Sequence, residues 1–242
     1  MESTPVPQPP RPLHSMFTSV LPRYDLVNRI ITLGLDKRWR WLAAQTCLEN
    51  RPQTILDLGC GTGDLTISIA RLAEKNAEIV GLDYSQPMLE KAQKKAAKSG
   101  VGNMVRFIQG DATSLPFPDA HLDCVGISFA FRNLTHKNPL AQAHLAEVKR
   151  VLKPGGRYVI VESSQPENRL IRMLFHLYLR IFVAPVGTIL SGNSGAYRYL
   201  AESAGRFYSP SQVRDMLLEA GFRDICYRAL FFGAAGIHVA VK

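Results

Sequence analysis

From residue 54 onward the chain alternates between two kinds of hydrophobic pattern. Short apolar runs, each long enough for one buried strand, are followed by longer segments with the spacing of amphipathic helices. We expect helices at 64–75, 86–99 and 138–152 and strands at 54–58, 78–82, 104–108, 122–128 and 157–162. Alternation of this kind indicates an α/β fold, with a parallel, doubly wound sheet and helices on both faces.

The two ends of the chain extend this pattern. Residues 16–47 predict two helices ahead of the first strand, and 224–230 with 236–241 predict a terminal antiparallel hairpin. The hairpin brings the expected sheet to seven strands, most of them parallel. We expect residues 1–14, which are rich in proline, to form a flexible tail, and residues 15–242 to form a single domain.

Residues 168–200 interrupt the alternation. They hold a strongly apolar helix on which Arg172, His176 and Arg180, spaced four residues apart, form one polar ridge. Such a helix suits three places: the core, a lid over a hydrophobic substrate, or the interface of a membrane. The sequence leaves all three open.

Charge and cysteine content narrow the class of protein. The net charge of +9 suits an anionic partner such as a membrane surface. We expect no nucleic-acid partner, because no recognisable nucleic-acid module or row of base-stacking aromatics is present.

The four cysteines are scattered without a C-x-x-C pair, which predicts buried thiols in a reducing compartment and no metal site. No run of 18 uncharged apolar residues is present to span a membrane.

The richest chemistry lies where the first strand ends. Asp57, Gly59, Gly61 and Gly63 form a glycine-rich turn into a helix, and Asp83 ends the second strand. Such a turn lets a cofactor approach the backbone, and the spaced carboxylate can accept both hydroxyls of a ribose. A tight turn without a ligand is the alternative.

The residue after the turn indicates which cofactor binds. Asp64 stands where a dinucleotide site has its third glycine, and a carboxylate there would repel a pyrophosphate. S-adenosylmethionine carries no phosphate and therefore fits. A nicotinamide oxidoreductase is the rival from another enzyme class.

Further candidates follow the third and fourth strands, because ligands bind at the carboxyl ends of such sheets. Asp111 could accept the adenine amino group, and Ala112 offers a backbone amide. Ser128 ends the fourth strand, and Arg132 and Asn133 follow it into the same crevice. The plainer alternatives are a turn cap for Asp111 and a surface position for Arg132.

Several stretches resemble known methyltransferases. The glycine turn is similar to motif I of class I methyltransferases. Residues 15–242 as a whole resemble the ubiquinone/menaquinone biosynthesis C-methyltransferase family. The most diagnostic stretches are Phe131-Arg132-Asn133 and Ala196-Tyr197-Arg198-Tyr199-Leu200-Ala201-Glu202-Ser203, while 115–119 and 150–156 also match. Residues 162–166 and the proline-rich tail depart from the family pattern.

The resemblance implies a Rossmann-like class I fold and methylation of a ring carbon of a polyprenylated quinol, most simply demethylmenaquinol. It implies cofactor contacts at Thr62, Asp83, Asp111, Ala112 and Ser128. Arg132 is our first candidate for holding the developing phenolate, because an arginine remains charged. Asn133 and Tyr197 are candidates for positioning.

Other interpretations stay open. The chain could be a class I methyltransferase acting on another small molecule or RNA, or a binding module without activity. The sequence does not distinguish a naphthoquinol from a benzoquinol, and it leaves a homodimer open. We expect a cytoplasmic protein that docks reversibly on the inner face of the cell membrane.

Overall fold

The computed structural model describes residues 24–191 and 204–242. The predicted tail at 1–14 and the end of the 168–200 segment lie outside the described residues. Seven strands form one sheet in the order β3-β2-β1-β4-β5-β7-β6. The strands are β1 (Thr54–Leu58), β2 (Glu78–Asp83), β3 (Val105–Gln109), β4 (Leu122–Ser128), β5 (Leu152–Ser163), β6 (Arg223–Leu230) and β7 (Ala235–Val241).

The sheet has the predicted topology. Strands β1 to β5 pair in parallel, whereas β7 pairs antiparallel with both β5 and β6. The chain leaves β1 on one side toward β2 and returns to its other side as β4, so the order reverses between β1 and β4. A reversal of this kind opens a crevice at the carboxyl ends of these two strands.

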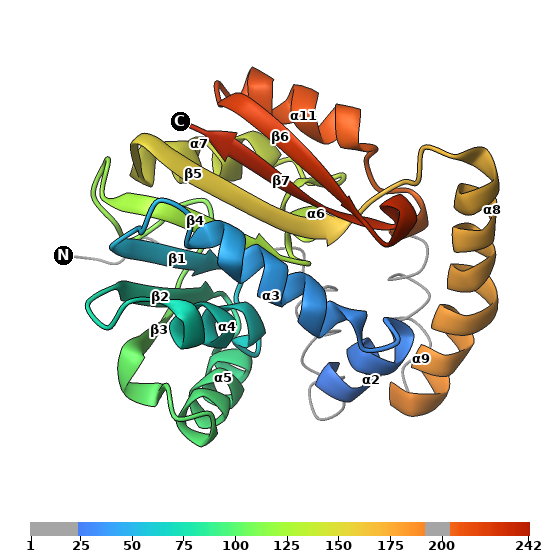
Figure 1. The fold of residues 1–242 in the computed structure, drawn as a ribbon, viewed down its shortest axis with the longest axis horizontal. Coiled ribbons are helices and arrows are strands. Elements are labelled where there is room, and N and C mark those ends of the chain that lie inside the picture. The colour runs from blue at the N-terminus through green and yellow to red at the C-terminus, as the bar shows by residue number, and fades with distance from the viewer. Residues whose placement is uncertain (1–23, 192–203) are drawn as a thin grey trace.

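Helices cover both faces, and each face has its own core. On one face Ala44 of α3 (Leu35–Cys47) and Ile69 of α4 (Asp64–Leu72) pack against Ile55 of β1. On the other, residues of α7 (Ala141–Val151) and α11 (Pro210–Glu219) pack against Leu56 and Leu58. Successive residues of β1 therefore face opposite cores, as a buried strand requires. Figure 1 shows α3 crossing in front of the sheet and α7 behind it.

Some predicted boundaries were wrong. The helix expected at 64–75 ends at Leu72, and a short helix, α6 (Phe131–Thr135), precedes α7. Helix α7 ends at Val151 and β5 starts at once, earlier than the expected 157, because Leu152 already pairs with Leu122 beyond a register shift. Helix α5 (Gln86–Lys98) begins after Ser85, with proline in the first turn. Helix α11, with its capping box at Ser209, was not predicted.

Three of the cysteines are buried as predicted, and none of the four forms a disulfide. Cys226 is exposed, which corrects the expectation of four buried thiols. Its strand, β6, lies at the edge of the sheet. A residue on an edge strand is covered from fewer directions than one on a central strand, and the apolar pattern of its segment does not report this.

The apolar segment after β5 lies outside the core. It forms α8 (Arg169–Tyr178), a π-helical turn η3 (Leu179–Val183) and α9 (Ala184–Ser191), which stand at the side of the molecule in Figure 1. Residues 169–190 are long and apolar enough to cross a membrane by length and composition, yet only 17% of the most apolar stretch is buried. The interpretation as a core helix was therefore wrong.

One side of this segment is anchored. Leu179 and Val183 pack against Val27 and Ile31 of α2 (Tyr24–Ile31), and the Tyr178 hydroxyl donates to the Ile31 carbonyl at 2.6 Å. The opposite side carries five exposed side chains that we call the apolar stripe: Leu170, Met173, Leu174, Leu177 and Ile181. The segment thus docks by one face and presents another apolar face outward.

Candidate functional site

The glycine turn lies between β1 and α4, at the point where the strand order reverses. All three glycines have positive φ: 65° at Gly59, 53° at Gly61 and 79° at Gly63. A Cβ on Gly59 would lie 2.9 Å from the Ala130 Cβ, and one on Gly63 would lie 3.0 Å from the Ala92 Cβ. A Cβ on Gly61 would meet nothing within 4 Å. Two glycines therefore permit close packing, while Gly61 leaves the turn open to a ligand.

Asp83 ends β2 and faces the turn. Its Oδ2 accepts the Gly61 amide at 2.8 Å, and its Oδ1 accepts the Ser85 amide at 2.8 Å. The carboxylate is therefore fixed in orientation beside the open glycine. This arrangement fits the predicted ribose contact, which stays a prediction.

Asp57 lies at the end of β1, behind the turn. Its side chain is buried, and its Oδ2 accepts a hydrogen bond from the Thr66 hydroxyl at 2.5 Å. Its Oδ1 is buried without a partner in the described part of the chain. Burial raises the pKa of Asp57 to about 7. An unpartnered buried oxygen of this kind is a sign of a functional position.

The Thr62 hydroxyl is held by side chains of α2 and α5. It donates to Asp25 Oδ1 of α2 at 2.7 Å and accepts from Lys95 Nζ of α5 at 3.1 Å. Lys95 also contacts Asp25 at 3.1 Å and Asp64 at 2.6 Å. These contacts lower the pKa of Asp25, against the desolvation that acts to raise it. A contact of Thr62 with the cofactor stays a prediction.

Asp111 and Ala112 follow β3 as predicted. Asp111 Oδ1 accepts the amide and the hydroxyl of Thr113, both at 2.8 Å. This is the turn-capping role that the sequence left open, and it also fixes the carboxylate at the carboxyl edge of the sheet. Ala112 packs partly buried against the core. A contact of either residue with adenine stays a prediction.

Ser128 ends β4, and the next residues lead directly to Arg132. Phe129 has a φ of 55°, a region that bulky residues rarely adopt, and the chain then enters α6. Because Ala130 lies against Gly59, the structure brings the segment 128–133 beside the glycine turn. The parallel topology thus places candidates from β1, β2, β3 and β4 at one edge.

Arg132 is buried in an ion pair, which contradicts the alternative of a surface arginine. Its Nη1 lies 3.6 Å from Glu162 Oε1 and donates to Ser163 Oγ at 3.1 Å. Glu162, at the end of β5, also accepts the Arg132 amide at 3.1 Å and the Ser163 amide at 2.9 Å. Arg132 Nε and Asn133 Oδ1 are buried and have no hydrogen-bond partner among the described residues. Two consecutive residues therefore each present a buried polar group without a hydrogen-bond partner, a donor on Arg132 and an acceptor on Asn133.

Sequence reasoning missed two site residues. Arg40 of α3 donates from Nε to Ser128 Oγ at 3.1 Å, and its guanidinium carbon lies 5.2 Å from the Phe129 ring centroid. Glu162 could have been found, since it ends a parallel strand as the other candidates do. Arg40 could not, because its helix is placed by tertiary packing. Tyr197 lies outside the described residues.

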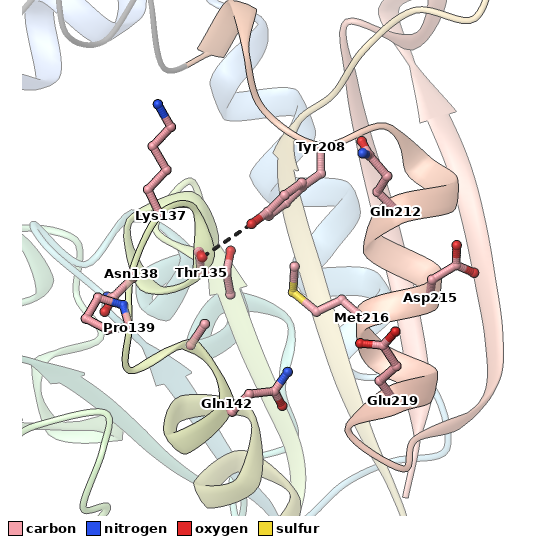
Figure 2. A pocket seen from close by; sticks show the side chains of 11 residues that line it. Thr135, Lys137, Asn138, Pro139, Gln142, Tyr208, Gln212, Asp215, Met216 and Glu219 are labelled. Carbon is pink, nitrogen blue, oxygen red and sulfur yellow. Dashed lines mark hydrogen bonds between the residues drawn. The ribbon is translucent and has the colours of Figure 1, made fainter.

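A separate hollow of about 680 Å³ lies on the α6–α7 loop and α11. Figure 2 shows Tyr208 reaching across it, with its hydroxyl 3.4 Å from the Thr135 carbonyl oxygen. Its lining includes Lys137, Asp215 and Glu219 but none of the candidate cofactor or catalytic residues. In the part of the chain that the structure describes, no cluster of three or more His, Cys, Asp or Glu could hold a metal ion.

Comparisons with known proteins agree on one family. The model of the ubiE/COQ5 methyltransferase family matches residues 8–242, so the match begins inside the proline-rich stretch that we expected to lie outside the family pattern. Demethylmenaquinone methyltransferase of Thermus thermophilus is 43% identical over 224 residues, which cover 93% of this chain and 98% of that protein. Ubiquinone/menaquinone biosynthesis C-methyltransferase UbiE of Pseudomonas entomophila is 33% identical, with 100% of this chain and 93% of that protein covered.

Solved structures agree on the fold. A SAM-dependent methyltransferase from Aquifex aeolicus matches with a TM-score of 0.56 at 21% identity, covering 82% of this chain and 88% of that one. At 21% identity this match establishes the fold but says nothing about the reaction. The predicted Rossmann-like α/β fold is therefore confirmed.

Proposed function

We propose that this chain, which belongs to the ubiE/COQ5 methyltransferase family, transfers a methyl group from S-adenosylmethionine to a ring carbon of a polyprenylated quinol. The family membership confirms the resemblance seen in the sequence. The observation that carries the proposal is the juxtaposition of the open glycine, Gly61, and the unsatisfied Arg132 at one edge of the sheet. The position beside Gly61 suits the methyl donor, and the position beside Arg132 suits the acceptor.

The acceptor is most simply demethylmenaquinol. Three relatives named demethylmenaquinone methyltransferase are 36% to 43% identical to this chain, whereas five named ubiquinone/menaquinone biosynthesis C-methyltransferase UbiE are 33% to 34% identical. The difference favours the naphthoquinol ring over the benzoquinol. A class I methyltransferase acting on another small molecule is the alternative.

S-adenosylmethionine, when bound, supplies a methyl group on a cationic sulfur. The protein must then orient the ring and stabilise the charge that develops on its phenolic oxygen. Arg132 suits this role because its Nε is a buried donor without a partner among the described residues, while Glu162 and Ser163 hold the rest of the side chain in place. Asn133 Oδ1 offers an acceptor for a phenolic hydroxyl. Tyr197 remains a candidate for positioning from the family resemblance alone.

An aromatic row connects this site to the surface. Trp39 lies 6.1 Å from Phe129 and 6.3 Å from Phe231, and Phe231 lies 5.6 Å from Phe232, each measured between ring centroids. Phe232 is 75% exposed at the tip of the β6–β7 hairpin. An apolar row that ends at the surface suits the binding of a prenyl tail.

The decisive test is a methylation assay. The purified protein is incubated with labelled S-adenosylmethionine and a reduced, short-tailed demethylmenaquinol, and the product ring is identified by mass spectrometry. A ring-methylated menaquinol supports the proposal, and the matching benzoquinol reports ring preference. Arg132→Met should lose turnover while Arg106→Met, which changes an exposed arginine on β3, should not. If S-adenosylmethionine binds tightly but no methylated quinol forms, quinol methylation is refuted and only the assignment of the methyl donor stands.

The apolar stripe supports reversible contact with an anionic membrane surface, from a cytoplasmic enzyme on the inner face of the cell membrane. The five side chains of the stripe are 48% to 65% exposed, and no Asp or Glu occurs between 168 and 191. Arg169 and Arg180 are exposed near it. The packing of η3 against α2 supports an orientation in which the segment lies along the surface of the lipid.

Vesicle flotation tests this contact. The protein should float with vesicles containing phosphatidylglycerol at low salt and less with neutral phosphatidylcholine. Changing Leu170, Leu174 and Ile181 to Ser should abolish flotation, whereas Leu218→Ser, an exposed apolar residue on α11, should not. Flotation that survives the triple change would refute the assignment of this surface. A concentration-dependent dimer that the triple change disrupts would assign the stripe to a homodimer instead.

A further inference from the structure

Arg40 connects three parts of the candidate site. Its Nε donates to Ser128 Oγ at 3.1 Å, its Nη1 donates to Asp36 Oδ2 at 2.6 Å, and Nη1 also lies 3.8 Å from Asp64 Oδ2. The guanidinium lies beside the Phe129 ring, and only 11% of the side chain is exposed. The structure therefore holds this guanidinium in one orientation at the end of β4.

One edge of the Arg40 guanidinium is unused. Within the described part of the chain, Nη2 makes no hydrogen bond, although Nε and Nη1 both do. The neighbouring cation, Lys95, differs: its ammonium already contacts Asp25, Thr62 and Asp64. A fixed guanidinium with an unused edge is well suited to bind a carboxylate.

The order of the strands indicates which part of a ligand would reach Arg40. Asp111 follows β3 and Asp83 ends β2, so these two residues mark the nucleoside end of the crevice. The open Gly61 lies at β1, and Ser128 with Arg40 lies at β4, on the far side of the turn. A ligand with its ribose at Asp83 that extends past Gly61 would bring its other end to Arg40.

That other end, in S-adenosylmethionine, is an amino acid with an α-carboxylate. We propose that Arg40 binds this α-carboxylate and thereby distinguishes methyl donors with an amino-acid tail from other adenine nucleosides. The inference rests on the proposed function, since it requires S-adenosylmethionine as the donor. Arg40 is then a positioning residue whose fixed edge sets where the tail, and with it the methyl group, lies in the crevice.

Two ligands that differ only in the carboxylate test this role. Titration calorimetry measures the Kd of S-adenosylhomocysteine and of its decarboxylated analogue for the wild type, Arg40→Met and Arg38→Met. Arg38 lies exposed on the same helix, so its variant removes the same charge without touching the site. Arg40→Met should weaken S-adenosylhomocysteine about 10- to 100-fold, the range of one charged hydrogen-bonded pair, and change the decarboxylated analogue little. Arg38→Met should leave both unchanged.

Other outcomes would overturn the inference in distinct ways. Equal loss of both ligands in Arg40→Met would mean that Arg40 only holds α3 in place. A wild type that binds S-adenosylhomocysteine but shows no preference over the decarboxylated analogue would also exclude the carboxylate contact while leaving the proposed function intact. A wild type that binds neither would remove the proposed function itself. If Arg40→Met does not fold, Arg40→Lys keeps the charge without the second nitrogen, and it should weaken only the carboxylated ligand.

Discussion

The ion pair between Arg132 and Glu162 should be one of the most sensitive points in the fold. Their side chains are 5% and 3% exposed, respectively. Both Glu162 oxygens accept backbone amides, Oε1 from Ser163 and Oε2 from Arg132. In Glu162→Gln, the new NH₂ group would face one of these N–H donors, and the guanidinium would lose its buried counter-charge. Removing one partner of a buried pair typically costs about 3–5 kcal/mol.

Urea unfolding measures this cost. Glu162→Gln should lower the free energy of unfolding by about 3–5 kcal/mol, and the double variant with Arg132→Met should recover part of that loss because no charge then stays buried. The control is Glu78→Gln, which breaks the exposed pair with Arg106 and should cost about 0–1 kcal/mol. A loss in Glu162→Gln no larger than that of the control would refute the view that Arg132 depends on Glu162 for its charge.

Three further predictions concern the turn and buried titratable groups. Gly61→Ala should weaken the binding of S-adenosylhomocysteine at least tenfold in calorimetry, because the added methyl group would occupy the space left for the ligand. The control is Gly100→Ala, which also changes a glycine at positive φ with nothing within 4 Å and should leave binding unchanged. Burial lowers the pKa of His238 from 6.5 to about 4, so its contribution to stability is present above pH 6.5 and is lost as the pH falls toward 4. Over that range the free energy of unfolding of His238→Gln, measured by urea unfolding, should fall less steeply than that of the wild type, by roughly 3 kcal/mol in total. Burial raises the pKa of Asp57 from 3.8 to about 7, so the wild type loses stability as the pH rises from about 4 to 7. Relative to the wild type, Asp57→Asn should gain stability over that range, by about 2–4 kcal/mol at pH 8, and an unchanged difference in the free energy of unfolding would contradict this.

Parallel topology explains why much of the site was predictable. Each strand from β1 to β4 ends at the same edge, so polar residues at strand ends had to converge there, as Asp83 and Ser128 do. Side chains from the preceding helices were missed because a helix is placed by its packing and not by its own period. Arg40 belongs to a short basic cluster whose other members, Lys37 and Arg38, are exposed, and nothing in that pattern separates the buried cation from its neighbours.

For the segment 168–191 as well, the sequence could not predict how a helix packs in the fold. Its composition predicted an apolar helix, but composition does not say which face is covered. The structure supplies the answer through α2, whose Val27 and Ile31 bury Leu179 and Val183 and leave the apolar stripe outside. Three interpretations stayed open in the sequence because each needs an apolar helix, and the position of a second helix excludes the core helix.

Helix α2 is therefore the element that connects the two halves of the proposed chemistry. Asp25, in its first turn, accepts from the Thr62 hydroxyl and pairs with Lys95, so the helix is tied to the glycine turn by charge. Its apolar side, two residues further on at Val27, is tied to the segment that carries the stripe. These ties differ in kind: the charged contacts weaken with salt, and the apolar ones do not. Because one eight-residue helix makes both, the surface proposed to meet lipid and the turn proposed to meet the methyl donor share one structural support.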